Sequence, residues 1–473
     1  MSLETFLLMR HELLLIAAAL LVLMAEIFWN QDKRRYISLF SIVIFGVITI
    51  AGFLPSPAGQ LFGGMYVTNG TRLLMKNILN IGALIVFLQS VTWLNKDENS
   101  EKISEYFILL VSTLIGMNFM ISAGHFLMFY IGIELATIPI AALAAFERYK
   151  NNSAEAGIKL ILSSALSSGI LLYGLSMIYG TTGTFYFQGI AELFKNTNLQ
   201  ILGFIFFFAG MAFKISIVPF HLWTADVYEG SPINITSYLS VVSKGAAIFI
   251  LIIILFTVFP VIMATWQKTI YVTSILTMTI GNLFAIRQQN LKRFLAFSSI
   301  SQAGYILLGF IGGNQLGMAS VIYYILVYIF SNLGAFGVVI AISNATGKEN
   351  MDDYNGLYHT NPKLSLALTL ALFSLAGIPP VAGFFGKFFL FTAAAQQGFY
   401  FLVLIAVLNT IISLYYYLLV VKAMFINKGD TPILKFSSDF PTRFALGLCM
   451  AGIVATGFAS IIFEVIKDWS YGV

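Results

Sequence analysis

The sequence predicts an all-α polytopic membrane protein of about 14 transmembrane helices, and three observations carry this prediction. Of the 473 residues, 59% are hydrophobic and only 10% are charged. The mean hydropathy is +0.88, outside the range of soluble globular domains. A spanning helix needs about 20 mostly apolar residues, and such runs lie near residues 13–29, 36–54, 74–94, 104–122, 125–146, 156–179, 201–222, 233–257, 269–286, 293–312, 317–343, 364–396, 401–425 and 444–466.

The distribution of positive charge predicts the orientation of these helices. Lysine and arginine accumulate on cytoplasmic loops, and the net charge of the chain is +5. With the N-terminus outside, sixteen of these residues fall on cytoplasmic connections and six, Lys76 among them, on outer connections. We therefore expect both termini on the outer side. The cluster Lys33, Arg34 and Arg35 follows the first run, which has no A-x-A-like cleavage site and is expected to be a retained helix.

The chain has little that could carry electrons. Cys449 is its only cysteine, which excludes an internal disulfide, an iron–sulfur cluster and a cysteine-based zinc site. The connections between the apolar runs are short, and none is long enough to fold as a soluble domain. We therefore expect any redox cofactor or nucleotide site to belong to a partner.

Two of the apolar runs are interrupted by proline, which removes a helical hydrogen bond and clashes with the preceding turn. MAFKISIVPFHLWTADVYEGSP carries Pro219 after Lys214, and SLAGIPPVAGFFGKFFLF carries Pro379 and Pro380 before Lys387. A lysine before one break and after the other is typical of two inverted repeats, each containing a broken helix. We assign residues 1–103 to N-terminal helices 1–3, 104–257 to the first repeat, 269–425 to the second, and 426–473 to a C-terminal loop and the last helix. Two unrelated proline kinks are the alternative.

Charged residues inside the apolar runs are the candidate site. A lysine at the centre of a spanning helix costs roughly 2.5–3.5 kcal/mol on insertion scales, so it is a functional candidate by default. Glu134 lies near the middle of one run and Lys214 is its natural partner, because opposite charges about 4 Å apart attract by roughly 4 kcal/mol at an effective dielectric near 20. Separating such a pair would release a proton from the lysine. A neutral, hydrogen-bonded Glu134 and a static ion pair are the alternatives.

Four further residues extend this candidate path. His221 could accept and donate a proton, or simply form a hydrogen bond at a helix end. Lys244 and Lys387 have no nearby acid in sequence and could alternate between neutral and charged forms; the alternative is a lysine bound to carbonyls freed at a helix break. Lys159 follows Glu155 at i+4, so an ordinary helix salt bridge is an equally good interpretation.

Asp226 and Glu229 are expected in the loop after the first broken helix, beside Tyr228, Gly230 and Pro232. They could form a cytoplasmic rim that collects protons. An ordinary solvated turn explains the same residues.

These motifs also carry a family resemblance. FKISIVPFHLWTADVYEGSP followed by SVVSKGAAIF resembles the signature of the antiporter-like membrane subunits of respiratory complex I, and the VPFHLW core is most similar to the subunit N branch of the bacterial NADH:quinone oxidoreductases. The blocks IGIELATIPIAAL, EAGIKLILSSALSSGILLYG, NLKRFLAFSSISQAGY and LAGIPPVAGFFGKFFLF resemble further parts of that branch in the same order, over about residues 104–397.

The resemblance implies roles for the candidate residues. Glu134 and Lys214 would form the charged pair of a proton half-channel, Lys159, His221 and Lys244 its connecting axis, and Lys387 its outlet. Lysine at the outlet fits subunits N and L, and the long lateral helix of subunit L is not expected here. Phe297 departs from the family, which usually has tyrosine at this position. Water, Ser298, Ser299 or Tyr305 would have to bridge that step, unless the central relay runs differently.

The function that the resemblance implies is that of a membrane-arm subunit which moves protons outward while partner subunits oxidise NADH and reduce quinone. FMN, iron–sulfur clusters and quinone are expected on those partners, with no cofactor or metal on this chain. The expected partners are other antiporter-like and small membrane subunits in a bacterial inner membrane, and no nucleic acid. The rivals are a subunit of a multi-subunit sodium/proton antiporter and a scaffold whose charges are only structural.

Overall fold

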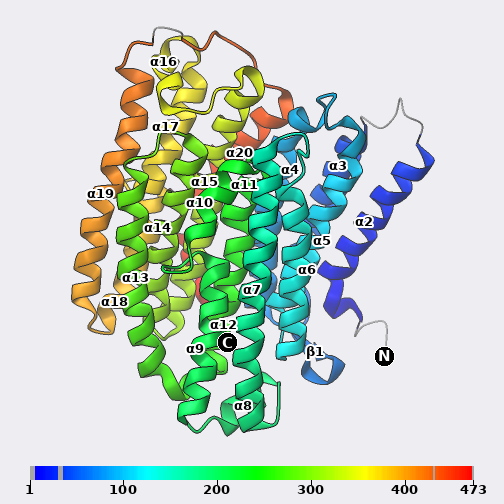
Figure 1. Cartoon of the computed structure of the whole chain (residues 1–473), viewed down its shortest axis with the longest axis vertical. Coiled ribbons are helices and arrows are strands. Elements are labelled where there is room, and N and C mark those ends of the chain that lie inside the picture. Colours follow the sequence, from blue (N-terminus) through cyan, green and yellow to red (C-terminus); the bar gives the residue numbers. More distant parts are fainter. Residues whose placement is uncertain (1–5, 30–35, 430–431, 471–473) are drawn as a thin grey trace.

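A computed structural model describes residues 6–29, 36–429 and 432–470, so Lys33, Arg34 and Arg35 lie outside the described residues. The chain forms an upright bundle of helices, with two short strands at the end where α2 begins (Figure 1). The strands β1 and β2 pair antiparallel, with Gly59 opposite Thr68 and Leu61 opposite Tyr66. Gly63 and Gly64 make the turn between them at φ of 64° and 90°, a region that glycine enters without steric cost.

The elements follow one another along the chain with short connections. They are η1 (Leu7–Met9), α2 (Arg10–Phe28), α3 (Tyr36–Gly52), β1 (Gly59–Leu61), η3 (Phe62–Gly64), β2 (Tyr66–Thr68), α4 (Gly70–Leu94), η4 (Ser100–Lys102), α5 (Ile103–Ile121), α6 (Phe126–Ala144), α7 (Asn151–Thr182), α8 (Phe187–Leu193), α9 (Asn198–Ile215), α10 (Leu222–Gly230), α11 (Ile233–Tyr238), the π-helical turn η5 (Leu239–Ser243), α12 (Lys244–Thr257), η6 (Pro260–Ile262), α13 (Met263–Ala285), α14 (Leu291–Ile311), α15 (Gln315–Thr346), η7 (Met351–Tyr354), α16 (Leu357–Thr360), α17 (Pro362–Ala376), α18 (Ala382–Gln396), α19 (Tyr400–Phe425), α20 (Phe440–Phe458) and α21 (Ser460–Trp469).

Eleven helices in the described part of the chain are long and apolar enough to cross a membrane. They coincide with eleven of the fourteen predicted runs. The other three runs fall on α3, which has 17 residues, on the threonine-rich α13, and on α17 and α18, which divide the run 364–396. The polytopic helical fold is therefore confirmed for eleven spans, and the full count of fourteen is not.

Both predicted helix breaks are present. α9 ends at Ile215 and α10 begins at Leu222, while α17 ends at Ala376 and α18 begins at Ala382. Ser216 ends the first helix at φ 68°, and Gly377 ends the second at φ 86°. The peptide bonds Val218–Pro219 and Pro379–Pro380 within the two breaks are cis. Lys214 thus lies just before its break and Lys387 just after its own, as the proline pattern predicts.

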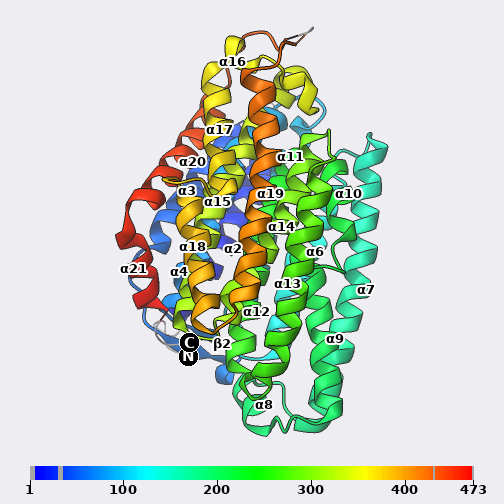
Figure 2. The same cartoon turned by 90° about the vertical axis from the view of Figure 1, so that its left-hand side faces the viewer.

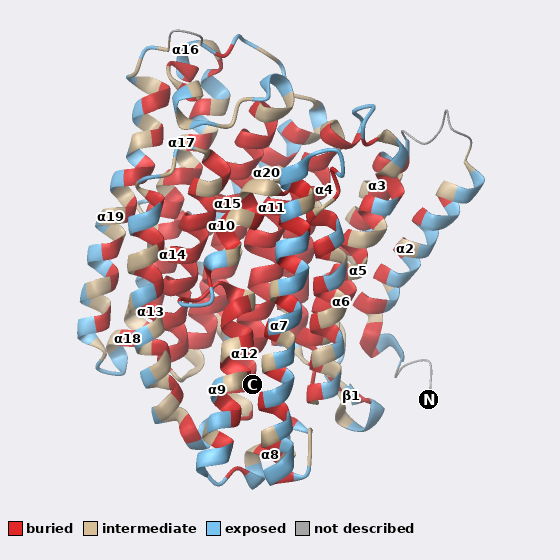
Figure 3. Ribbon diagram, in the orientation of Figure 1, coloured by how far each residue is buried: buried red, intermediate tan, exposed pale blue. Residues whose placement is uncertain are grey.

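The centre of the bundle is formed by α12, α14 and α15, which lie behind and between the outer helices in two perpendicular views (Figure 2). Every residue in the most apolar stretch of α14 is buried. The outer helices α2, α7 and α19 expose one face each (Figure 3). A bundle that buries its central helices completely can hold charged groups far from water, which is the setting of the candidate site.

Candidate functional site

Lys214 lies in the last turn of α9, and its ammonium donates a hydrogen bond to the Thr137 hydroxyl on α6. Thr137 in turn donates to the carbonyl oxygen of Ile133 at 2.6 Å. Glu134 lies three residues before Thr137 on the same helix and is partly buried. Among the described residues, its Oε1 has no hydrogen-bond partner and it forms no ion pair with Lys214. The expected pair is therefore close enough for electrostatic attraction but is not in contact, and Thr137 is the direct partner of the lysine.

The break after Lys214 is held by specific hydrogen bonds rather than by helical ones. The amide of Ile217 donates to the carbonyl oxygen of Ala212 at 2.8 Å, and the amide of Val218 donates to Thr277 Oγ1 at 3.0 Å. His221 ends the break as the cap of α10 and is buried, at 8% exposure. Its Nδ1 has no partner among the described residues. Because the helix is interrupted here, His221 is not two regular turns beyond Lys214.

Lys244 is the first residue of α12, directly after the π-helical turn η5. It is 2% exposed, and its ammonium donates to Ser299 Oγ at 3.0 Å and to the Ser299 carbonyl oxygen at 3.3 Å. Its Nζ lies 5.9 Å from the centre of the Tyr228 ring. A π-helical turn leaves backbone geometry irregular and is frequent at functional sites.

Lys387 lies in the second turn of α18 and is 3% exposed. Its ammonium donates to the carbonyl oxygen of Ala376 at 3.0 Å, across the break between α17 and α18. It also lies 4.4 Å from the centre of the Tyr305 ring, within the range of a cation–π interaction. The lysine is thus bound to a carbonyl freed at a helix break, as one of the two sequence interpretations expected.

A chain of side-chain contacts runs from the neighbourhood of Lys244 towards Lys387. Ser298, adjacent to the Lys244 ligand, shares a hydrogen bond of 2.6 Å with the Tyr417 hydroxyl. Gln302 Nε2 donates to Tyr417 at 3.3 Å and to the carbonyl oxygen of Leu375 at 3.1 Å. Leu375 precedes Ala376, whose carbonyl oxygen binds Lys387. Neither Tyr417 nor Gln302 was expected in the path; a glutamine within an apolar run is the signal that could have identified Gln302, and Tyr417 has no such signal.

Phe297 does not take part in these contacts. Its ring stacks on that of Phe284, with centroids 5.4 Å apart, and lies 5.9 Å from the guanidinium carbon of Arg293. Ser298, Ser299 and Tyr305, three of the groups considered as bridges, do contact members of the path.

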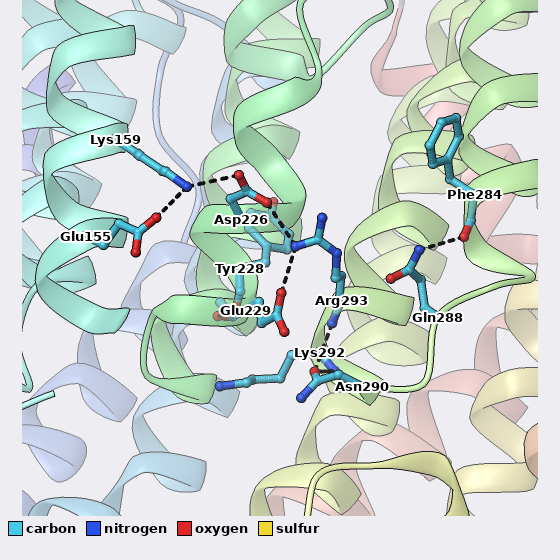
Figure 4. A network of polar contacts seen from close by, with 11 residues as sticks. Glu155, Lys159, Asp226, Tyr228, Glu229, Phe284, Gln288, Asn290, Lys292 and Arg293 are labelled. Atoms are coloured by element: carbon cyan, nitrogen blue, oxygen red, sulfur yellow. Dashed lines mark hydrogen bonds and ion pairs between the residues drawn. The ribbon is translucent and has the colours of Figure 1, made fainter. Parts of the chain in front are cut away.

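Lys159 lies at the surface of the chain rather than inside it. Its side chain is 42% exposed and pairs with Glu155 at 2.6 Å and with Asp226 at 3.1 Å. Figure 4 shows the network that follows: Asp226 and Glu229 both reach the guanidinium of Arg293, at 2.9 Å and 2.7 Å. The network joins α7, α10 and α14. The alternative interpretation of Lys159, an i,i+4 salt bridge with Glu155, is therefore confirmed, and the expectation that Lys159 is buried is wrong because the helix turns this residue outward.

Asp226 lies on the nine-residue α10, the second half of the first broken helix, and so does Glu229, whereas the sequence pattern placed both in the loop after that helix. The Asp226 carboxylate accepts hydrogen bonds from Lys159 at 3.1 Å and from Arg293 at 2.9 Å. Next to it, Glu229 also lines two cavities of about 410 and 260 Å³. The larger extends to Asn234 on α11, the element that leads to Lys244. The predicted rim of Asp226 and Glu229 is thus an ion-pair network beside polar cavities.

One cluster of ionisable groups was missed by the sequence analysis. Lys76, expected on an outer connection, is wholly buried in α4 and pairs with the equally buried Glu12 of α2 at 2.6 Å. Tyr66 of β2 contacts both side chains. In residues 6–29, 36–429 and 432–470, no group of three or more His, Cys, Asp or Glu side chains is placed to hold a metal ion.

Comparisons with known proteins agree with this geometry. Residues 123–413 match the family model described as NADH:quinone oxidoreductase/Mrp antiporter, TM. NADH-quinone oxidoreductase subunit N of Phocaeicola vulgatus is 52% identical over 469 residues, with 99% of each chain covered. A chain of respiratory complex I from Thermus thermophilus with bound Aureothin superposes with a TM-score of 0.80 at 25% identity, covering 97% of this chain and 98% of that one.

A chain of the Mrp complex from Dietzia sp. DQ12-45-1b superposes with a TM-score of 0.88 at 21% identity, covering 99% and 97% of the two chains. That likeness concerns the fold alone. The extent of the family match and the identity to subunit N relatives show that the chain belongs to the family of antiporter-like membrane subunits of NADH:quinone oxidoreductases and Mrp antiporters, in its subunit N branch.

Proposed function

We propose that this chain is a proton-translocating membrane-arm subunit of a complex I-type NADH:quinone oxidoreductase. The observation that carries the proposal is the ligand set of three lysines in the described structure. Lys214, Lys244 and Lys387 are held by hydroxyl and carbonyl oxygens, and none of them forms an ion pair. An amine held only by neutral ligands can release and regain a proton without breaking an ion pair. A structural scaffold would instead pair its buried charges with opposite ones.

The proton path begins on the side of the α10–α11 connection, where the polar cavity beside Glu229 reaches Asn234. Glu134 sets the charge of Lys214 from a short distance, and movement of one relative to the other changes the proton affinity of the lysine. α9 packs against α12, which carries Lys244. His221, in the break between these groups, is a candidate to pass protons along this part of the path.

The second half of the path carries the proton from Lys244 to Lys387. Ser299 binds Lys244, and the contacts Ser298–Tyr417–Gln302 bring a chain of hydrogen-bonding groups to the break that holds Lys387. These contacts do not include Phe297, so the hydroxyl that a tyrosine would supply at that position is not required. Lys387 releases the proton on the other side of the membrane. Lys159 lies at the surface of the chain, outside this path, where it forms an ion pair with Asp226.

The energy for transport comes from partner subunits. Moving one charge against 100 mV costs about 2.3 kcal/mol, and the single cysteine of the sequence, Cys449, is too few to hold an iron–sulfur cluster. FMN, iron–sulfur clusters and quinone belong to the partners, which include other antiporter-like and small membrane subunits. The location is a bacterial inner membrane, with both termini outside.

We extend the same proposal to the fold. α3, α13 and the two-part helix α17–α18 complete fourteen spans. The two broken helices, with a lysine before one break and after the other, support inverted repeats over residues 104–257 and 269–425.

The experiment that tests the function replaces Lys214 by methionine in the intact complex, reconstituted into vesicles. The expected result is an assembled complex that oxidises NADH but takes up far fewer protons per NADH. Lys195→Met is the matched control, because Lys195 is an exposed lysine in the α8–α9 connection. Normal proton uptake by an assembled Lys214→Met complex would overturn the proposal.

A subunit of a sodium/proton antiporter remains the alternative, and the family model, whose description includes Mrp antiporters, is the observation in its favour. The two differ in what accompanies the chain. Purification from native membranes in mild detergent should yield flavin and iron–sulfur subunits with NADH-driven quinone reduction. Co-purification with antiporter-like subunits alone, without redox activity, would favour the exchanger.

A further inference from the structure

Glu12, Lys76 and Tyr66 form a buried acid–base cluster outside the path described above. The Lys76 ammonium donates to Glu12 Oε1 at 2.6 Å and to the Tyr66 hydroxyl at 3.0 Å, and the Tyr66 hydroxyl lies 3.0 Å from Glu12 Oε2. All three side chains have 0% exposure. Three separate elements, α2, α4 and β2, supply one residue each, so the cluster exists only in the folded bundle.

The remaining charged and titratable groups around the cluster are positive or neutral. His11 on α2 shares a hydrogen bond of 2.9 Å with Asn77 on α4, next to Lys76. Arg10 donates to the carbonyl oxygens of Gly52, Leu54 and Pro55 and so lies turned towards the end of α3. Arg72 is 6% exposed and donates to the carbonyl oxygen of Val67 at 3.0 Å. Glu12 is therefore the single carboxylate that these described side chains surround.

The cluster is connected to the interior through α4. The side chains of Met75 and Leu79 pack against Gly245, the neighbour of Lys244. Asn80, one turn beyond Lys76, is wholly buried, and neither atom of its amide has a hydrogen-bond partner among the described residues. Both polar atoms of an amide can form hydrogen bonds, so Asn80 is a buried polar group of α4 one turn further along the helix than Lys76.

On its other side the cluster approaches the surface of the bundle end where α2 begins and α21 ends. A cavity of about 450 Å³ there is lined by Gly64, Val67, Arg72 and Glu192, among others. Tyr66 is the residue before Val67, and Arg72 lies one turn before Lys76 on α4. The elements β2 and α4 thus each supply one residue to the cluster and a nearby residue to the lining of the cavity.

We propose that Glu12, Lys76 and Tyr66 form a second proton-transfer site, which passes protons from the region of Lys244 to the cavity at Arg72 and Glu192. The proposal rests on the proposed function of the chain as a proton translocator. It assigns to the N-terminal helices a route distinct from the outlet at Lys387.

Each transfer balances in protons. An arriving proton forms an O–H bond on the Glu12 carboxylate, which leaves the Lys76 ammonium without its counter-ion. Lys76 then loses a proton towards the cavity, with the Tyr66 hydroxyl as the hydrogen-bonded neighbour, and becomes a neutral amine. The Glu12 proton moves to that amine and restores the ion pair, so one proton has entered and one has left.

The test uses the double variant Glu12→Gln/Lys76→Met in the intact, reconstituted complex. Replacing both members avoids an unpaired buried charge, which would destabilise the fold by itself. The expected result is normal assembly with a loss of proton uptake per NADH. The matched control is Glu464→Gln/Lys467→Gln, which removes an exposed pair on α21 at the same end of the bundle. That control should leave uptake unchanged.

Each outcome decides the proposal. Normal uptake by the assembled double variant would show that the pair only ties α2 to α4, and would overturn it. If the double variant fails to assemble, Tyr66→Phe decides, because it keeps the ion pair and removes only the hydroxyl: reduced uptake supports the route and unchanged uptake rejects it. Lys214→Met separates this inference from the proposed function. A loss with Lys214→Met and none with the double variant rejects the second site alone, whereas no loss with Lys214→Met rejects the proposed function.

Discussion

The ammonium of Lys387 lies 3.0 Å from the carbonyl oxygen of Ala376, so the lysine of one half-helix closes the end of the other. Gly377 makes this contact possible. It adopts φ 86°, and a Cβ at this position would lie 3.1 Å from Lys387 Cδ. The charge of Lys387 and the geometry of the break are therefore coupled, and a change at Gly377 reports on both.

Gly377→Ala should therefore impair proton uptake as well as stability. A left-handed conformation costs a non-glycine residue roughly 1–2 kcal/mol, and the new methyl group also pushes on Lys387. Gly398→Ala is the control, because Gly398 has φ 82° and open space around its Cβ position. Thermal unfolding of the complex should show a loss of stability for both variants, at least as large for Gly377→Ala, with lower proton uptake per NADH for Gly377→Ala only. Equal uptake in the two variants would contradict the coupling.

Tyr417→Phe should slow proton movement without preventing assembly. The substitution removes the hydroxyl that contacts Ser298 and Gln302 and keeps the ring in place. Uptake into vesicles at matched rates of NADH oxidation is the measurement. Tyr415→Phe on the same helix is the control, because Tyr415 is 56% exposed. If Tyr417→Phe behaves like Tyr415→Phe, protons do not pass through this hydroxyl.

Arg293→Gln should weaken the junction of α7, α10 and α14 by a small, salt-dependent amount. Arg293 pairs with both Asp226 and Glu229, but these side chains are roughly a third or more exposed. Pairs of this kind contribute about 0.2–1 kcal/mol each and are screened by salt. Thermal unfolding of the variant and the parent complex should therefore converge as ionic strength rises. A difference that persists in high salt would indicate that the network is buried by a partner subunit.

The sequence predicted the parts of the fold that depend on local chemistry. Proline and glycine marked both helix breaks, and the apolar runs located eleven spans. It offered the salt bridge of Lys159 with Glu155 as one interpretation but could not choose it over a buried lysine, because an apolar run does not tell which helix face meets the core. Lys76 was misassigned for a related reason: it lies near a helix start, where lysine usually reaches water, and only the folding of α2 and β2 over α4 buries it.

The partner of Lys214 was also beyond sequence reasoning. Threonine within a helix commonly bonds to its own backbone, as Thr137 does with Ile133. That it also receives the lysine follows from where α9 ends, which depends on the packing of two distant segments. The Glu134 carboxylate, which is near Lys214 but not in contact with it, can change the proton affinity of the lysine without forming an ion pair.

Thr137→Val should consequently impair proton uptake while the complex still assembles. The two side chains have nearly the same shape, but valine cannot accept the hydrogen bond from Lys214. Loss of one such bond to a charged group costs about 1.5–3 kcal/mol. Without the Thr137 hydroxyl, the Lys214 ammonium is free to move towards Glu134 and form a static ion pair, which the structure does not contain. Proton uptake per NADH in vesicles is the measurement. Thr369→Val is the control, since Thr369 makes the same intrahelical bond to the carbonyl oxygen of Ser365 on α17. Unchanged uptake in Thr137→Val would mean that Glu134 alone governs Lys214, and restored uptake in Thr137→Ser would confirm that the hydroxyl is the essential group.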